Sequence, residues 1–517
     1  MRVTTLKAGD AGPGALVDYY AGLAADQMRR DGRSRGPVDY YLDPNEPPGR
    51  WWGEGCAAMG VAGQVQPEQL ARLLIARHPG VGRRLGRSFG AKSARGFDAT
   101  FSTPKSASAL WALTDDPWVR AEVLAGHDAA ALAALEWFQR HGAVTRRGKD
   151  GVHQVDARGL VAALFRQHTS RSADPQLHTH AVISSKVQDP TGKWLALDSR
   201  FLKRQQRSIS WVYSAALRSE LTGRLGVSWG PTSDGHAEID GVPAGILELF
   251  SQRTAQVEAK TAELIAGWID EHDGAEPDGR TLYRLERAAV RASRPSKRGA
   301  VDAETLRAEW VRRARDAGFE ALTLPDRQPH LPGATPVGID EIVAKALETV
   351  SSSSSTWLRA DLAREIAVLL PPEASATAAD AVALCDRLAD EAAGRCVELT
   401  WPRCSRRQAA DGRPATEHVV DRRVTTPAVL AQERRLIDWA RESVESVPEH
   451  SGQEAVRAIT GQAMLVLLVG PAGAGKTRLL GEASAALIRS GRPALGLAPS
   501  GKAADVLAKC PRTPHAI

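Results

Sequence analysis

FRQHTSRSADPQLHTHAVI, residues 165–183, carries three histidines within thirteen residues and decides the fold of the region around it. His178 and His180 are two apart and run into β-prone apolar residues 181–183, so in a strand both imidazoles project from one face. His168 ends a second apolar run, and residues 169–177 between them predict a hairpin connection. Pairing of the two strands would place a third imidazole beside the first two. Three neutral imidazoles suit a divalent metal with positions left open for substrate, although a His-x-His pair can also be solvated or hydrogen-bonded in a core.

Length and composition indicate a soluble protein of several domains. A chain of 517 residues predicts two or three domains, and 43% hydrophobic with 25% charged residues is ordinary for globular protein. The net charge of +6 suits a polyanionic partner without requiring one. The five cysteines have no close pairs, which favours a reducing cytoplasm over a disulfide framework or a structural zinc site. The N-terminus lacks a signal-peptide pattern, and the longest apolar run, residues 463–469, is too short to span a membrane, so we expect a cytoplasmic protein without membrane insertion.

The chain divides into three segments by composition. Residues 1–320 alternate strand-like stretches (97–103, 160–168, 178–187) with helix-like stretches (119–140, 208–224), which predicts an α+β domain whose antiparallel sheet carries the histidines. Residues 321–418 begin with a Pro- and Gly-rich linker and continue with helical stretches at 339–350 and 355–369. The serine run 351–355 between these stretches fits either a hinge or a cap on the second helix. Residues 419–517 form the last segment.

Tyrosines and one aspartate add candidate chemistry to the first segment. Four of only six tyrosines form two doublets, Tyr19–Tyr20 and Tyr40–Tyr41. A tyrosine can attack phosphorus when a metal polarises the phosphate, although a doublet can also be core packing. In the alternating segment 97–102, Asp98 lies on the face opposite the phenylalanines, where its carboxylate could orient a ligating imidazole, accept a tyrosine proton or simply face water.

A basic stretch and a pair of tryptophans can be interpreted in two ways. Arginines and a lysine recur between residues 83 and 95, and Trp51 and Trp52 precede them. They fit a DNA backbone track with stacking surfaces, or equally a solvated loop with core tryptophans.

The last segment contains a phosphate-binding loop pattern. An apolar run at 465–469 leads into GPAGAGKT, residues 470–477, and then into a helical stretch, which is the order strand, loop, helix. The glycines let backbone N–H groups wrap phosphates, Lys476 reaches the β and γ oxygens, and Thr477 offers a hydroxyl to Mg²⁺. The predicted nucleotide-binding residues are Gly470, Gly473, Gly475, Lys476 and Thr477.

Together these motifs resemble the relaxase domain of the TrwC/TraI-type conjugative relaxases, the MobF class of HUH endonucleases. The matching stretches run in the family's order through residues 1–320: LVDYYAG, VDYYLD, WWGEGCAAMGVAGQV, FDATFSTPKS, the histidine stretch and VDAETLRAEW. Residues 419–517 resemble the start of the superfamily 1 helicase that follows the relaxase in this family. The resemblance implies an HUH relaxase fold with a central antiparallel sheet flanked by helices, followed by an incomplete RecA-like P-loop segment.

The resemblance also implies the chemistry. It implies metal-dependent, site- and strand-specific nicking of single-stranded DNA through a 5′-phosphotyrosine intermediate, which starts conjugative transfer. Tyr19 matches the principal nucleophile, Tyr20 is its neighbour, and Tyr40 and Tyr41 match a doublet used in a second strand transfer. His168, His178 and His180 match the metal ligands, and Asp98 matches the acidic residue beside them. The doublets here are twenty-one residues apart, wider than the family pattern, which weakens the role of Tyr40.

Cofactors and partners follow from the same resemblance. We expect Mg²⁺ or Mn²⁺ at the histidines, with Zn²⁺ an alternative, and at most weak binding of ATP–Mg²⁺ at the phosphate loop. The sequence ends forty residues after Thr477 without an acidic strand end for the nucleotide's metal, so we expect no helicase turnover. Expected partners are single-stranded DNA at an origin of transfer, a type IV secretion coupling protein and relaxosome accessory proteins. A rolling-circle replication initiator and an inactive DNA-binding remnant are the alternative functions.

Overall fold

The computed structural model describes residues 1–7, 48–170, 172–293, 303–324, 338–399, 406–443, 452–469, 475–492 and 494–497. The chain forms two compact units. The first comprises Met1–Arg253 and Pro295–Thr426, and the second comprises Thr254–Arg294 and Pro427–Ile517. Among the described residues, no helix is both long enough and apolar enough to cross a bilayer.

A five-stranded antiparallel sheet organises the first unit. Its strand order is β1-β3-β7-β6-β2. The strands are β1 (Arg2–Lys7), β2 (Arg50–Trp52), β3 (Ala94–Ser102), β6 (Ala162–Thr169) and β7 (Pro175–Ser184). The predicted hairpin is therefore present as β6 and β7, and the predicted strand at 97–103 is β3. The expected α+β fold with a central antiparallel sheet is confirmed.

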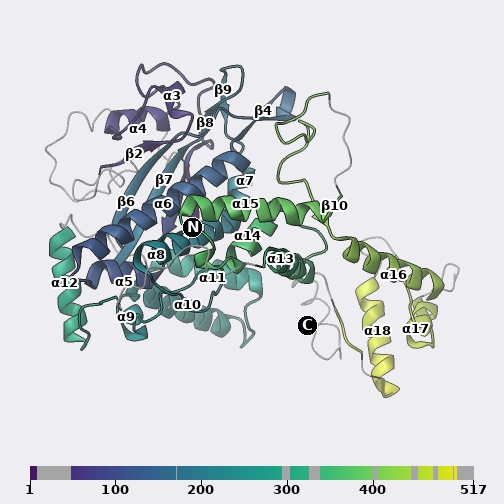
Figure 1. Cartoon of the computed structure of the whole chain (residues 1–517). Coiled ribbons are helices and arrows are strands. Elements are labelled where there is room, and N and C mark those ends of the chain that lie inside the picture. Colours follow the sequence, from purple (N-terminus) through teal and green to yellow (C-terminus); the bar gives the residue numbers. More distant parts are fainter. Residues whose placement is uncertain are drawn as a thin grey trace. The chain divides into compact units, whose positions relative to one another are not determined.

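Long helices cover one face of this sheet (Figure 1). They are α5 (Lys105–Leu113), α6 (Pro117–Gly142) and α8 (Gln206–Leu225). Phe101 of β3 packs its ring 5.3 Å from that of Tyr213 on α8, and both side chains are buried. Helix α6 begins where Asp116 accepts the Trp118 N–H and Pro117 fits the first helical turn. Burial of this apolar layer fixes which residues of the central strands point away from the helices.

A smaller apolar cluster covers part of the opposite face. It joins the sheet residues Phe165 and Val182 to helix α3 (Cys56–Met59) and helix α4 (Pro67–Leu74). Trp51 belongs to this core at 8% exposure, and its indole N–H donates to Gln69 Oε1 over 3.1 Å. Of the two readings of Trp51, core packing is correct and a stacking surface for DNA is wrong.

Short elements complete the sheet-bearing unit. Two hairpins pair β4 (Val144–Arg147) with β5 (His153–Asp156), and β8 (Lys186–Gln188) with β9 (Trp194–Ala196). The short helices are α7 (Arg200–Arg204) and α9 (Ala244–Leu249), and 3₁₀ turns lie at Lys149–Gly151 and Pro372–Ala374. Helix α12 (Ala303–Asp316) packs on α5.

The middle helices pack onto the sheet-bearing unit. They are α13 (Ile339–Ser353), α14 (Arg359–Leu369) and α15 (Ala378–Gly394), followed by the strand pair β10 (Val397–Glu398) and β11 (Val424–Thr425). The buried Arg218 of α8 donates to the Ala367 carbonyl over 2.7 Å, and Glu220 accepts the Ala378 N–H over 2.7 Å. Residues 339–426 thus share a compact unit with the relaxase-like segment, although their sequence predicted a separate region.

The serine run does not cap the second helix, because it ends the first one. Ser351, Ser352 and Ser353 form the last turn of α13, and the Ser351 hydroxyl bonds to the Leu347 carbonyl. Helix α14 begins only at Arg359, where the Asp361 carboxylate accepts the Leu358 N–H over 2.9 Å. A carboxylate in the first turn therefore provides the cap expected from a serine or threonine hydroxyl.

The described part of the second unit is helical. Its helices are α10 (Gln252–Glu271), α11 (Gly279–Ala292), α16 (Pro427–Ser443), α17 (Gly452–Thr460) and α18 (Lys476–Arg489). The strand expected at 465–469 is not formed, and Leu467 and Val469 are 63% and 93% exposed. An isolated apolar run gains its ladder hydrogen bonds only from neighbouring strands, and the described residues of this unit include none.

Candidate functional site

The register of strands β3 and β7 places His178 and His180 near Asp98. Thr100 of β3 lies opposite His180 of β7, and Asp98 lies opposite Val182. Because side chains alternate along a strand, Asp98, Thr100, His178 and His180 share the face turned away from α6 and α8. The two imidazole rings are 5.0 Å apart and meet edge to face at 73°.

Asp98 fixes the orientation and tautomer of His180. Its two carboxylate oxygens lie 2.9 and 3.0 Å from His180 Nδ1, and both residues are at least nine-tenths buried. The Thr100 hydroxyl oxygen is 3.2 Å from the same nitrogen. A carboxylate can only accept here, so Nδ1 carries a proton, and in a neutral ring the lone pair is then on Nε2. Of the three roles considered for Asp98, the geometry favours orienting the imidazole and excludes a water-facing strand edge.

A backbone carbonyl holds His178 in the same tautomer. His178 Nδ1 donates to the Gln176 carbonyl over 2.8 Å, so the lone pair again resides on Nε2. Burial lowers the pKa of His178 to about 4, and the adjacent His180 ring acts in the same direction. The ring is therefore neutral at physiological pH, which is the form that binds a metal.

His168 lies where the pairing of β6 and β7 becomes irregular. The register pairs Phe165 with His180 and Gln167 with His178, and then shifts before Thr169 pairs with Pro175. His168 occupies this bulge and stacks on Trp111, with ring centroids 4.9 Å apart. Among the described side chains, no three His, Cys, Asp or Glu residues gather closely enough to hold a metal ion. The structure thus brings together His178, His180 and Asp98, and the part of His168 stays a prediction.

The donor chemistry of the gathered pair fits a borderline divalent metal. Both imidazoles are buried, present Nε2 lone pairs and have their Nδ1 protons fixed by an oxygen acceptor. A metal-ligating histidine typically shows this second hydrogen bond to a carboxylate or carbonyl. The pair therefore shows the second hydrogen bond that metal-ligating histidines typically make.

The predicted nucleophiles cannot be placed beside this pair. Tyr19, Tyr20, Tyr40 and Tyr41 all lie outside the described residues. Their roles stay predictions of the sequence.

Comparison with known proteins decides the family. The model of the TrwC relaxase family matches residues 14–317, more than half of the chain. This chain belongs to the TrwC relaxase family. A second model, for an AAA domain, matches residues 449–513, which contain the phosphate loop.

Two curated relatives cover the same part of this TrwC-family chain. The multifunctional conjugation protein TraI of Escherichia coli is 30% identical over 355 residues, which is 63% of this chain and 18% of the relative. TraI of Escherichia coli strain K12 is 28% identical over 346 residues, again 63% of this chain and 18% of the relative. The chain therefore spans less than a fifth of the length of these relatives.

Solved structures of the conjugative relaxase TrwC with OriT DNA are also similar. The metal-free complex is 29% identical, covers 62% of this chain and 99% of the solved chain, and has a TM-score of 0.47. The metal-bound complex is 32% identical with the same coverage and the same TM-score.

Behind the histidine pair, this TrwC-family member has a buried polar chain that the sequence analysis missed. His127 of α6 lies with Nε2 2.7 Å from the Thr179 hydroxyl oxygen and Nδ1 2.8 Å from the Tyr213 hydroxyl oxygen. All three side chains are more than nine-tenths buried. A histidine within the apolar pattern of residues 119–140 was the available signal, because a buried imidazole requires partners.

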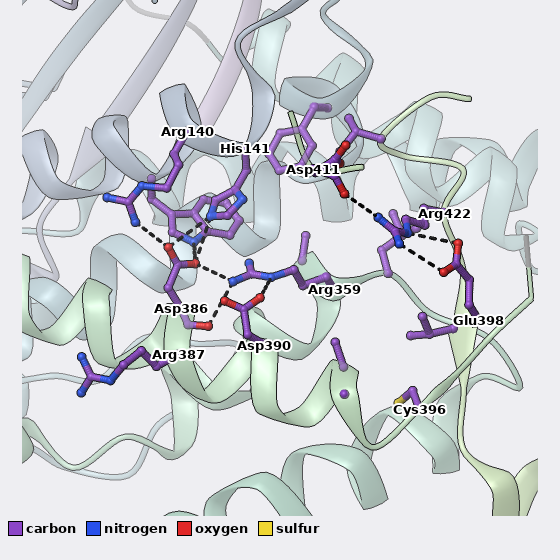
Figure 2. Close-up of a pocket in the computed structure, with 18 of the residues that line it drawn as sticks. Arg140, His141, Arg359, Asp386, Arg387, Asp390, Cys396, Glu398, Asp411 and Arg422 are labelled. Carbon is purple, nitrogen blue, oxygen red and sulfur yellow. Dashed lines mark hydrogen bonds and ion pairs between the residues drawn. The ribbon is translucent and has the colours of Figure 1, made fainter. Parts of the chain in front are cut away.

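A second polar cluster lies in a cavity between α6 and the middle helices (Figure 2). The cavity has a volume of about 780 Å³. Asp386 of α15 is at the centre of the polar cluster. It accepts hydrogen bonds from Trp137 Nε1 (2.8 Å), Arg140 (2.6 Å), His141 Nε2 (3.0 Å) and Arg359 (3.1 Å). Burial alone would raise the pKa of Asp386, but the bonds and charges of His141, Arg359 and Trp137 outweigh it and hold the pKa well below its usual range. Because these donors come from α6 and α14, the cluster ties three helices together.

The phosphate loop is described only at its end. Helix α18 begins at Lys476, and Gly475 before it has φ +78°, a left-handed conformation that favours glycine. Gly470 and Gly473 lie outside the described residues. The helix predicted after the loop is thus present, and Lys476 and Thr477 start it.

Proposed function

We propose that this chain nicks single-stranded DNA, in a metal-dependent and strand-specific reaction, at an origin of transfer. The observation that carries the proposal is the buried set of His178, His180 and Asp98 on the central sheet of a TrwC-family chain. The printed names of the relatives and solved structures, a conjugation protein and a relaxase with OriT DNA, support the same reaction.

The histidines bind the metal in this proposal. His178 and His180 supply Nε2 lone pairs, and His168 on the neighbouring strand supplies the third. When bound, a divalent ion, Mg²⁺ or Mn²⁺, withdraws charge from a non-bridging oxygen of the scissile phosphate. Asp98 keeps His180 in the ligating tautomer and adds a negative charge behind it.

Tyr19 performs the covalent step. Its phenol oxygen attacks phosphorus in line with the bond to the 3′ oxygen, which leaves as a free 3′-OH while a 5′-phosphotyrosine bond forms. The phenol loses a proton and the departing oxygen gains one, so the step is balanced in protons. Since one phosphate ester replaces another, a later strand transfer can reseal the DNA; Tyr20, Tyr40 and Tyr41 are the candidates for it.

The remaining expectations concern the second unit and the partners. Gly475, Lys476 and Thr477 contact the phosphates and Mg²⁺ of a bound ATP, together with Gly470 and Gly473. A type IV secretion coupling protein and relaxosome accessory proteins meet the DNA-bound chain in the cytoplasm.

A covalent-adduct assay tests the nicking reaction. The full chain is incubated with Mn²⁺ and single-stranded oligonucleotides from the origin region beside its gene, and the adduct is resolved on a denaturing gel. The wild type forms the adduct, whereas Tyr19→Phe and His178→Ala do not. Tyr283→Phe is the matched control, because Tyr283 is a 56% exposed tyrosine of α11.

The outcomes separate the alternatives. An adduct in Tyr19→Phe at the wild-type level would refute the assigned nucleophile. Cleavage confined to a replication origin would instead indicate a rolling-circle initiator. DNA binding without any adduct would indicate an inactive remnant.

A further inference from the structure

The buried chain Tyr213–His127–Thr179 lies directly behind the histidine pair. Thr179 stands between His178 and His180 on β7, and strand alternation turns its side chain to the helix-covered face. There its hydroxyl oxygen meets His127 Nε2 at 2.7 Å, and His127 Nδ1 meets the Tyr213 hydroxyl at 2.8 Å. The chain thus links β7 to α6 and α8 at the one residue that separates the two proposed ligands.

In this row of hydrogen bonds, His127 donates to one hydroxyl and accepts from the other, so both of its ring nitrogens are used. A neutral imidazole has one donor and one acceptor nitrogen, so one hydroxyl donates to the ring and the other accepts from it. Burial lowers the pKa of His127 to about 3, with the charge of Arg166 as the next cause, so the ring is neutral. With His127 at 0% exposure, loss of either hydroxyl would leave a ring nitrogen buried without a partner.

The contacts on the two faces of β7 therefore fix different parts of the geometry: ring rotation on one face and backbone position on the other. On the ligand face, Asp98 and the Gln176 carbonyl set the rotation of the two rings. On the rear face, the bond to Thr179 sets where the backbone of residues 178–180 lies relative to α6 and α8. Ligand distances to a metal are fixed within a few tenths of an ångström, so the backbone position matters as much as ring rotation.

We propose that His127 is a positioning residue for metal binding: through Thr179 it holds the β7 backbone so that both Nε2 atoms converge on one ion. This inference rests on the proposed function, because it assumes that His178 and His180 are the ligands. His127 contacts neither the ion nor the DNA in it.

Mn²⁺ binding to the full-length protein tests the role without DNA cleavage. Bound Mn²⁺ is followed by loss of the free-ion electron paramagnetic resonance signal, with His178→Ala giving the background from other sites. Thr179→Val, which removes only the rear hydroxyl, and His127→Phe should each weaken Mn²⁺ binding about tenfold or more. Thr179→Ser keeps the hydroxyl and should keep the wild-type affinity. Adduct formation by Thr179→Val should return when Mn²⁺ is raised.

The matched pair at residue 179 decides the question even where His127→Phe does not fold. If Thr179→Val binds Mn²⁺ as tightly as the wild type and only melts at a lower temperature, the chain is merely structural and the positioning role is refuted. If Thr179→Ser loses as much affinity as Thr179→Val, the hydroxyl is not the cause and the role is refuted as well. Wild-type protein that binds no Mn²⁺ above the His178→Ala background would overturn the proposed metal site itself, which is a distinguishable result.

Discussion

Replacing Asp386 with alanine should destabilise the sheet-bearing unit strongly. The side chain of Asp386 is 10% exposed and serves donors from two other helices (Figure 2). Its loss leaves the indole N–H of Trp137, a residue at 0% exposure, without an acceptor, which costs about 1–3 kcal/mol. It also removes one of the two carboxylates that pair with Arg359, which is 27% exposed and keeps Asp390, whereas Arg140 is 56% exposed and contributes little because water screens it. We expect a total loss of about 3–5 kcal/mol, as for one partner removed from a buried ion pair.

Two milder variants separate charge from shape. Asp386→Asn keeps an oxygen for Trp137 but loses the charge, so it should cost about 1–2 kcal/mol. Asp390→Asn is the control, since this carboxylate is 67% exposed and pairs with Arg359 on the surface, so its loss should cost less than about 1 kcal/mol.

Urea unfolding followed by circular dichroism measures these differences. The pKa of Asp386 is depressed in the folded protein, so its stabilisation is present above its unfolded pKa of roughly 4 and is lost as the pH falls further. The wild type should therefore lose more stability than Asp386→Asn on acidification below roughly pH 4. Alanine at 386 with wild-type stability, or a control variant as damaging as alanine, would refute the reasoning.

Three further predictions concern the histidine pair and the phosphate loop. Asp98→Asn leaves His180 with a neutral acceptor and should weaken Mn²⁺ binding about 10- to 100-fold, measured by titration; unchanged affinity would exclude the orienting role. Burial lowers the pKa of His178 to about 4, so between roughly pH 6.5 and that value the unfolded chain binds more protons, and metal-free protein should lose stability as the pH falls through this window. His178→Ala should flatten that part of the pH profile, and an identical profile would contradict the assignment. Lys476→Ala should abolish binding of a fluorescent ATP analogue by the full chain, with Lys345→Ala on α13 as the control; equal binding by both variants would dissociate the phosphate loop from nucleotide.

The sequence predicted the central hairpin well because a half-buried strand repeats every two residues. His178 with His180, and Asp98 with Thr100, could each be assigned to one face of their own strand from that period, and the register of β3 and β7 places the two pairs on the same face. His168 could not be placed in this way, because the register shift before Thr169 is a tertiary feature that local alternation does not encode.

The packing of helices that are far apart in the sequence was the second feature that the sequence could not predict. The helical period of residues 339–350 and 355–369 predicted helices but not their partner, since Arg218 and Ala367 are 149 residues apart. His127 was hidden for a related reason, as its two partners lie 52 and 86 residues away. The apolar run at 465–469 failed differently: a strand requires neighbouring strands, and its own pattern cannot supply them.

The hydrogen bond between Trp137 and Asp386 also has a consequence for folding during translation. The two residues are 249 positions apart, so at roughly 5–20 residues per second the ribosome needs about 12–50 s to deliver the aspartate after the tryptophan. During that interval helix α6 lacks the contacts that α15 later makes with it. Every residue of the proposed metal site precedes residue 181, yet the unit that contains the site closes only after some 390 residues have emerged. Synthesis rate and chaperone access in that window should therefore affect the yield of folded protein.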